Sequence, residues 1–157
     1  MTVTVHKDAE ARRMTITTEL DAPAERVWLL WADPRQLERW WGPPTHPATV
    51  VEYDLTPGGS VSFFVTGPAG ERRSGWWRVV DVDAPHRLEF DLGDPDIPTV
   101  RVRVSIDEHD VGGTHMTIET TFPSDEAMDH LLSIGFDEGM SNAVRQLEDA
   151  IRADAVP

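Results

Sequence analysis

Three groups of side chains have the residue types and spacing that acid–base, metal or ionic chemistry requires. The first is His115 and Glu119, which lie two alternations apart on a predicted strand and would form an acid–base or metal pair if both faced a cavity. Met116 and Ile118 fall on the opposite face of that strand. Polar and apolar residues that separate in this way are typical of a sheet with one solvated face, so we interpret His115 and Glu119 as solvent-facing.

The second group lies at the predicted start of the last helix, where Glu126 and His130 are spaced i, i+4 beside Asp125 and Asp129. Acidic side chains are favoured near the positive N-terminal end of a helix, which explains the cluster without a ligand. The sequence places no second histidine at ligand spacing from His130. We therefore predict a solvated cluster and no metal site.

The third group is Arg101 and Arg103, which would bind a carboxylate ligand through paired hydrogen bonds if they pointed inward. They alternate with Val100, Val102 and Val104 along a predicted strand. This pattern favours valines in the core and arginines on the exposed face of the sheet.

The sequence contains none of the common nucleophile or cofactor motifs. It has no cysteine, so disulfides, thiolate catalysis and cysteine-based metal sites are excluded. It has no Gly-x-Ser-x-Gly motif. Gly58-Gly59-Ser60 is not followed by the Gly-Lys-Ser/Thr of a phosphate loop, so we interpret it as a hairpin turn. We predict no cofactor.

The composition is that of one acidic globular domain, residues 1–157, with an ordered core at about residues 14–152. The 28 acidic and 14 basic residues give a formal net charge of −14. Nucleic acids and anionic membranes are bound by clustered lysine and arginine, so both are excluded as partners. No apolar run approaches the roughly 20 residues that span a bilayer, and we expect a cytoplasmic protein.

Hydrophobic periodicity predicts a strand, two short helices, six further strands and one long amphipathic helix. The N-terminal dozen residues are polar and are expected to be a frayed lead-in, and the first helix is expected to be capped by Asp21 or Ala22. The last helix is the only element long enough to cover the sheet. The predicted elements are strands at 14–20, 49–55, 60–66, 72–82, 86–92, 100–106 and 115–122, short helices at 24–31 and 34–41, and an unbroken helix at 125–152.

Tryptophan and glycine are placed unusually. There are six tryptophans and one tyrosine, and Trp40-Trp41-Gly42-Pro43 forms either an aromatic lip over a pocket or a structural corner, of which we favour the corner. Gly135 and Gly139 lie within the predicted last helix, where each costs about 0.8–1 kcal/mol relative to alanine. Either a ligand or a close neighbour in the fold must need that room.

A series of short motifs carries a family resemblance over about residues 14–151. The motifs are Asp21 to Trp28 at the first helix, Trp40-Trp41-Gly42-Pro43, Pro57-Gly58-Gly59, Gly75 before a strand, Ala84 to Leu88, and Gly135-Phe136 with Glu138-Gly139-Met140. In this order the chain resembles the family named for the activator of the heat-shock protein 90 ATPase, within the START-like (SRPBCC) superfamily, with Phe136 in place of the usual tryptophan. The resemblance implies an α+β helix-grip fold, in which a curved antiparallel sheet of six or seven strands grips the long C-terminal helix. That fold hosts many functions, so it assigns none by itself.

We predict a non-catalytic protein that binds an apolar or aromatic small molecule, such as a lipid or polyketide, between the sheet and the last helix. One alternative is an enzyme of the cyclase, aromatase or hydrolase type, with His46, His115, Asp137 or Glu138 as its acid–base group. Another is a protein-interaction module, either a chaperone partner or a homodimer. The candidate lining residues are Trp40, Trp41, Phe63, Trp77, Phe90, Val102, Met116, Phe136 and Met140.

Overall fold

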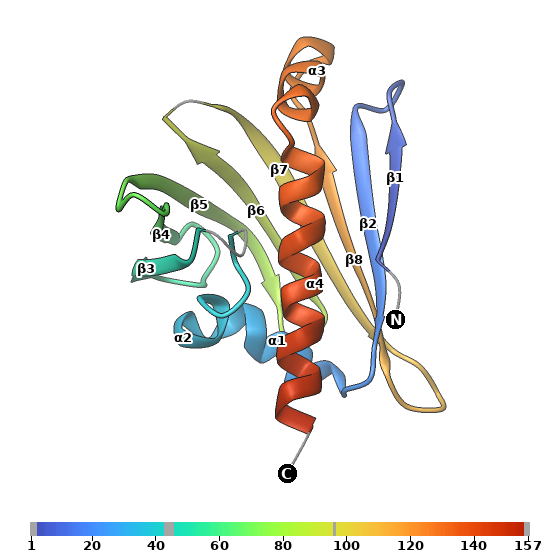
Figure 1. Ribbon diagram of the computed structural model, residues 1–157. Coiled ribbons are helices and arrows are strands. Elements are labelled where there is room, and N and C mark those ends of the chain that lie inside the picture. The colour runs from blue at the N-terminus through green and yellow to red at the C-terminus, as the bar shows by residue number, and fades with distance from the viewer. Residues whose placement is uncertain (1–2, 43–45, 96, 156–157) are drawn as a thin grey trace.

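The computed structural model describes residues 3–42, 46–95 and 97–155, and within them the chain forms eight strands and four helices (Figure 1). The predicted α+β class and the order of the elements are confirmed. The elements are β1 (Thr4–Asp8), β2 (Arg13–Leu20), α1 (Ala24–Ala32), α2 (Pro34–Leu37), β3 (Ala48–Tyr53), β4 (Ser60–Thr66), β5 (Arg72–Asp83), β6 (Arg87–Asp94), β7 (Ile97–Glu108), β8 (Thr114–Thr121), α3 (Asp125–Ser133) and α4 (Phe136–Ala155).

The strands form one antiparallel sheet in the order β1-β2-β8-β7-β6-β5-β4-β3. It has eight strands where six or seven were predicted, and the additional strand is β1, at the edge of the sheet. The expectation of a frayed N-terminal lead-in is therefore wrong for residues 4–8, which pair with β2. All five β1 residues are exposed, so they lack the alternation of apolar and polar residues by which a strand is recognised.

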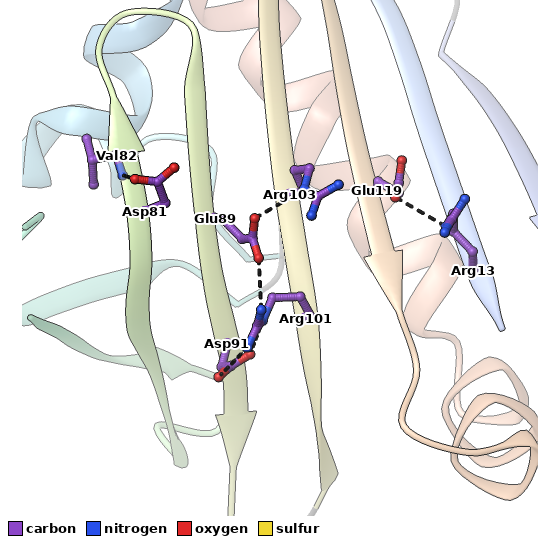
Figure 2. Close-up of polar contacts among 8 residues, drawn as sticks. All are labelled: Arg13, Asp81, Val82, Glu89, Asp91, Arg101, Arg103 and Glu119. Carbon is purple, nitrogen blue, oxygen red and sulfur yellow. Dashed lines mark hydrogen bonds and ion pairs between the residues drawn. The ribbon is translucent and has the colours of Figure 1, made fainter. Parts of the chain in front are cut away.

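The two faces of the sheet have opposite chemistry. Arg101 and Arg103 point away from the core and pair with carboxylates on the neighbouring strand: Arg101 with Asp91 and Glu89, and Arg103 with Glu89 (Figure 2). On β8, Glu119 pairs with an arginine of β2 on the same outer face (Figure 2). The solvent-facing interpretations of Arg101, Arg103 and Glu119 are confirmed, because opposite charges that lie directly or diagonally across antiparallel strands stabilise the exposed face without a ligand.

The inner face is apolar and supports α4, which crosses it (Figure 1). Val144, Leu147 and Ile151 of α4 are buried against the sheet. The buried Glu148 also faces β2, where its carboxylate accepts a hydrogen bond of 2.8 Å from the Thr18 hydroxyl. Such a bond offsets part of the cost of burying a carboxylate on the apolar face of a helix.

The last helix is not continuous. The prediction of one unbroken helix at 125–152 is wrong, because α3 ends at Ser133 and α4 begins at Phe136. Gly135, between them, has a φ of +88°, in the left-handed region that ends a helix and that only glycine adopts at little cost. The periodicity of the apolar residues continues through the break, which is why the sequence pattern did not reveal it.

The cap of α1 also differs from the prediction. Pro23 is the N-cap residue, and neither Asp21 nor Ala22 caps the helix. The first free N–H, that of Ala24, donates instead to the Glu108 carboxylate at 2.6 Å. A negative charge at a helix N-terminus is favourable, so the end of β7 supplies the cap that the local sequence lacks.

The N-terminal strand contacts α4 through one ion pair. The Lys7 ammonium lies 2.7 Å from the Asp137 carboxylate. This hydrogen bond lowers the pKa of Asp137 below its ordinary value of 3.8. The pair joins the edge of the sheet to the first turn of α4.

Alanine substitutions at the two glycines near the start of α4 should have opposite effects on stability. Gly135→Ala should lower the free energy of unfolding by about 1–2 kcal/mol, because alanine is strained at positive φ. Gly139→Ala should raise it by up to about 1 kcal/mol, because residue 139 lies inside α4. A Cβ at either position has no neighbour within 4 Å, so steric clash does not contribute to either change in the free energy of unfolding. Urea unfolding measures both values, and effects of the same sign would contradict the placement of the helix break.

The Lys7→Met variant should raise the pKa of Asp137 towards 3.8, as measured by NMR titration of the carboxyl carbon. A carboxyl group with a lowered pKa stabilises the fold above its unfolded-state pKa, and this contribution is lost as the pH falls through the folded-state pKa. The variant should therefore be less stable than wild type at neutral pH, by less than about 1 kcal/mol for a surface pair, and the difference should vanish in acid. Lys7→Arg is the control that keeps the positive charge. An unchanged Asp137 titration in Lys7→Met would refute the pairing.

Candidate ligand-binding cleft

A cleft of about 220 Å³ lies between the first half of α4 and the ends of β4 to β7. Most of its lining is apolar, aromatic or glycine. The lining residues are Trp41, Gly42, Phe63, Val65, Arg73, Ser74, Gly75, Leu92, Gly93, Asp94, Ile97, Phe136, Gly139, Met140 and Ala143.

Trp41 forms the wall that separates the cleft from the core. Its ring centroid lies 5.8 Å from that of Phe63, which also lines the cleft, and 5.1 Å from that of Trp77 in the core, both in edge-to-face arrangements. Only 7% of Trp41 is exposed. Edge-to-face contacts of this kind restrict the rotation of a ring, so Trp41 presents a fixed surface to the cleft.

Hydrogen bonds fix the backbone on both sides of Trp41. The side-chain amide of Gln146, on α4, donates to the carbonyl oxygens of Trp40 and Gly42. The Trp40 indole N–H donates to the Leu30 carbonyl oxygen of α1 at 2.7 Å. Trp40 therefore forms the structural corner that the sequence favoured, whereas Trp41 contributes to both the corner and the cleft.

Tyr53, the one tyrosine, joins β3 to the same corner. Its hydroxyl donates to the Trp31 carbonyl oxygen at 2.6 Å. Burial, with a smaller effect of the Asp33 charge, raises the pKa of the Tyr53 hydroxyl above its usual value. The raised pKa favours the protonated hydroxyl, which is the form that donates this hydrogen bond.

The nine predicted lining residues divide into two groups. Trp41, Phe63, Phe136 and Met140 line the cleft. The other five are buried in the core and do not line it, because alternation identifies the inward face of a strand but not the depth at which the face is filled. These five are Trp40, Trp77, Phe90, Val102 and Met116.

Two adjacent tryptophans of β5 point to opposite faces of the sheet. Trp77 is fully buried and stacks on Phe90 with ring centroids 4.1 Å apart. Trp76 points outward and covers Gly93, where an added Cβ would meet its ring. The inner end of the cleft is therefore closed by side chains that pack on one another.

Gly139 is the lining residue whose missing side chain leaves open space. It lies inside α4, and a Cβ built on it has no neighbour within 4 Å. Neither backbone strain nor a close neighbour requires glycine here, and alanine would be favoured in a helix by about 1 kcal/mol. Of the two readings of the paired glycines, room within the cleft applies to Gly139, whereas Gly135 ends a helix.

Two charged residues line the cleft, and sequence reasoning did not identify either of them. The Arg73 Nε lies 3.5 Å from a carboxylate oxygen of Asp94. The Asp94 side chain is 15% exposed and that of Arg73 is 53% exposed, so the carboxylate is the more enclosed partner. Asp94 lies beyond the predicted strand at 86–92, but β6 extends to it, so its side chain falls on the same face as Phe90 and Leu92.

The acid–base candidates from the sequence lie outside this cleft. His115 is on the outer face, with its Nδ1 2.5 Å from the Glu19 carboxylate, as predicted for a solvent-facing residue. Asp137 and Glu138 line a different groove, of about 580 Å³, between β1 and α4. His46 is not among the residues that line the cleft.

Glu19 accepts a second hydrogen bond on the outer face, from His109, also at 2.5 Å. These two bonds lower the pKa of Glu19.

Glu126 and His130 are exposed on α3. Within residues 3–42, 46–95 and 97–155, no group of three or more histidine or acidic side chains is arranged to hold a metal ion. Among the helices described, none has the length and apolar character needed to cross a membrane.

Solved structures resemble this chain along nearly its whole length. The crystal structure of protein Ms6760 from Mycobacterium smegmatis is 44% identical, covers 95% of this chain and 96% of its own, and has a TM-score of 0.85. The solution structure of a protein from Arthrobacter aurescens is 39% identical, covers 99% of this chain and 94% of its own, and has a TM-score of 0.93. A crystal structure from Rhodobacter sphaeroides, at 23% identity, with coverage of 97% and 99% and a TM-score of 0.86, shares the fold.

No curated protein matches the sequence. A family model does match, over residues 21–152, and its description is activator of Hsp90 ATPase homolog 1-like protein. This range contains every element from α1 to α3 and most of α4, including the whole lining of the cleft. The chain therefore belongs to the activator of Hsp90 ATPase homolog 1-like family.

Proposed function

We propose that the protein binds a small apolar or aromatic molecule in the cleft between α4 and the ends of β4 to β7. The observation that carries the proposal is the open space at Gly139, a helix position where the unliganded fold gains nothing from glycine. Apolar walls such as Trp41, Phe63 and Met140 supply affinity by burying apolar surface of the ligand.

The size of the cleft restricts the ligand. Its volume of about 220 Å³ is smaller than the roughly 300–1,000 Å³ of sites that enclose drug-sized ligands. A whole lipid or large polyketide would extend beyond the cleft, so the proposal favours a smaller molecule. The formal net charge of −14 also disfavours an anionic ligand.

A second candidate function is acid–base catalysis on the bound molecule, which is favoured by the Asp94 carboxylate in the cleft wall. Asp94 lies beside the Arg73 guanidinium, and its carboxylate oxygens are hydrogen-bond acceptors. The two functions differ in one measurement, because a binding protein returns its ligand unchanged in mass after incubation.

An interaction with another protein, including a second copy of this chain, would use a different surface. Val51 and Val80 are exposed apolar residues of β3 and β5, and Trp76 is 36% exposed. The charged pairs of Figure 2 occupy the outer face on β6, β7 and β8. Single exposed apolar side chains are common on soluble proteins, so this evidence is weaker than that for the cleft.

Filling the cleft at Gly139 should abolish binding without unfolding the protein. The neutral fluorescent probe N-phenyl-1-naphthylamine should bind wild type saturably, with a blue-shifted increase in emission. Gly139→Leu places a side chain in the open space and should weaken binding by about tenfold or more, whereas its free energy of unfolding should not fall, because leucine favours helix.

Asn142→Leu is the matched control, since it introduces the same side chain on α4 at an exposed residue that does not line the cleft. It should bind the probe as wild type does. If the probe does not bind wild type, or if both leucine variants bind equally well, the proposed site is wrong.

Phe136 and Phe122 allow binding to be separated from packing. Their rings lie 5.9 Å apart, but Phe136 is half-buried and lines the cleft, whereas Phe122 is buried and does not. Phe136→Ala should lower probe affinity and cost less than the about 3–5 kcal/mol of a core phenylalanine. Phe122→Ala should cost that amount while probe affinity is retained. Probe titration and urea unfolding give the two quantities, and the reverse ranking would contradict the assignment of the cleft.

A further inference from the structure

We infer that the ligand is a flat aromatic molecule of one or two rings with a hydroxyl group that donates to Asp94. This inference rests on the proposed function of the cleft and specifies the chemistry of its ligand. Three properties of the lining carry it: the enclosed volume, the shape of the walls, and the unequal exposure of the two charged residues.

The volume limits the ligand to a small ring system. About 220 Å³ is below the roughly 300–1,000 Å³ of sites that enclose drug-sized ligands. This is enough for one or two rings with a small substituent. A flexible long-chain molecule would leave most of its chain in water and would lose rotational freedom in the part that is bound.

The walls are suited to a planar ring. On the helix side Gly139 exposes backbone next to the side chains of Phe136 and Met140, which also line the cleft. On the sheet side Trp41 and Phe63 present aromatic surfaces in an edge-to-face pair with ring centroids 5.8 Å apart. A ring that lies between α4 and this aromatic wall would contact both Trp41 and Phe63. Such ring contacts add to the affinity that burial alone provides.

Asp94, rather than Arg73, would bind the polar group of the ligand. Both line the cleft, but the carboxylate side chain is 15% exposed and the guanidinium side chain is 53% exposed. A ligand within the cleft therefore meets an enclosed acceptor, while the positive charge extends towards solvent. A carboxylate has acceptor sites for several hydrogen bonds, so it can receive a ligand hydroxyl while it stays beside Arg73. A carboxylate ligand would be repelled by Asp94 and by the net charge of −14.

The test compares four probes on the intact protein by isothermal titration calorimetry: 2-naphthol, 2-methoxynaphthalene, 2-naphthoate and dodecanoate. We expect 2-naphthol to bind about tenfold more tightly than 2-methoxynaphthalene, because methylation removes the donor and keeps the ring. Both 2-naphthoate and dodecanoate should bind more weakly than 2-naphthol.

Substitution at residue 94 tests whether the preference for a donor depends on the carboxylate. Asp94→Leu keeps a branched side chain without an acceptor, so 2-naphthol and 2-methoxynaphthalene should then bind within about twofold of each other. Asp91→Leu is the matched control on the same strand, since Asp91 faces outward to Arg101 (Figure 2) and does not line the cleft. It should keep the full preference. If Asp94→Leu does not fold, Asp94→Asn serves, and the preference should fall because a neutral acceptor is weaker.

The possible results separate this inference from the function on which it rests. If no naphthalene probe binds wild type, the proposed binding function fails. If the naphthol and its methyl ether bind equally, or if Asp94→Leu keeps the preference, the cleft still binds aromatic molecules but the role of Asp94 is wrong. Tightest binding of 2-naphthoate would assign the polar end to Arg73, and tightest binding of dodecanoate would overturn the ring-shaped ligand.

Discussion

The contacts among Trp31, Trp41 and Trp77 are the interaction on which the rest of this structure depends. Trp31 belongs to α1, Trp41 follows α2, and Trp77 lies on β5, so their packing joins the helical corner to the sheet. Trp31 and Trp77 are fully buried, and their indole N–H groups have no conventional acceptor. The cluster is therefore stabilised by apolar burial and by ring contacts, including edge-to-face packing, rather than by hydrogen bonding. Its rigidity determines where the neighbouring wall of the cleft lies.

The cleft lies where the packing of α4 against the rest of the fold changes along the helix. Gln146 of α4 joins the helix to the tryptophan corner through the carbonyl oxygens of Trp40 and Gly42. The first half of α4 follows the break at Gly135. Within it, Gly139 has no side chain, so the space over β4 to β7 is left unfilled. The unfilled space beside the aromatic wall is the cleft to which the proposed binding function refers.

The sequence predicted what depends on local patterns. Alternation gave seven of the eight strands, the outward direction of Arg101 and the solvent-facing His115. It did not give β1, whose residues are all exposed, nor the break at Gly135, because apolar periodicity continues through it. Within the site, residues such as Phe136 were predicted because they are large and apolar, and Gly139 because it is costly in a helix. Asp94 was missed because the predicted strand ends at Leu92, whereas β6 continues to Asp94 and carries the alternation of Phe90 and Leu92 one step further.

Gly139 differs from Trp41 and Phe63 in its effect on stability. It lowers the stability of the unliganded fold by about 1 kcal/mol of helix propensity relative to alanine. Trp41 and Phe63, in contrast, stabilise the fold whether or not a ligand is present, because their rings pack on one another. The presence of such stabilising residues is explained by folding alone, without a ligand. Gly139 lines the same cleft as these rings, which is the arrangement expected when binding, rather than stability, determines the residue at a position.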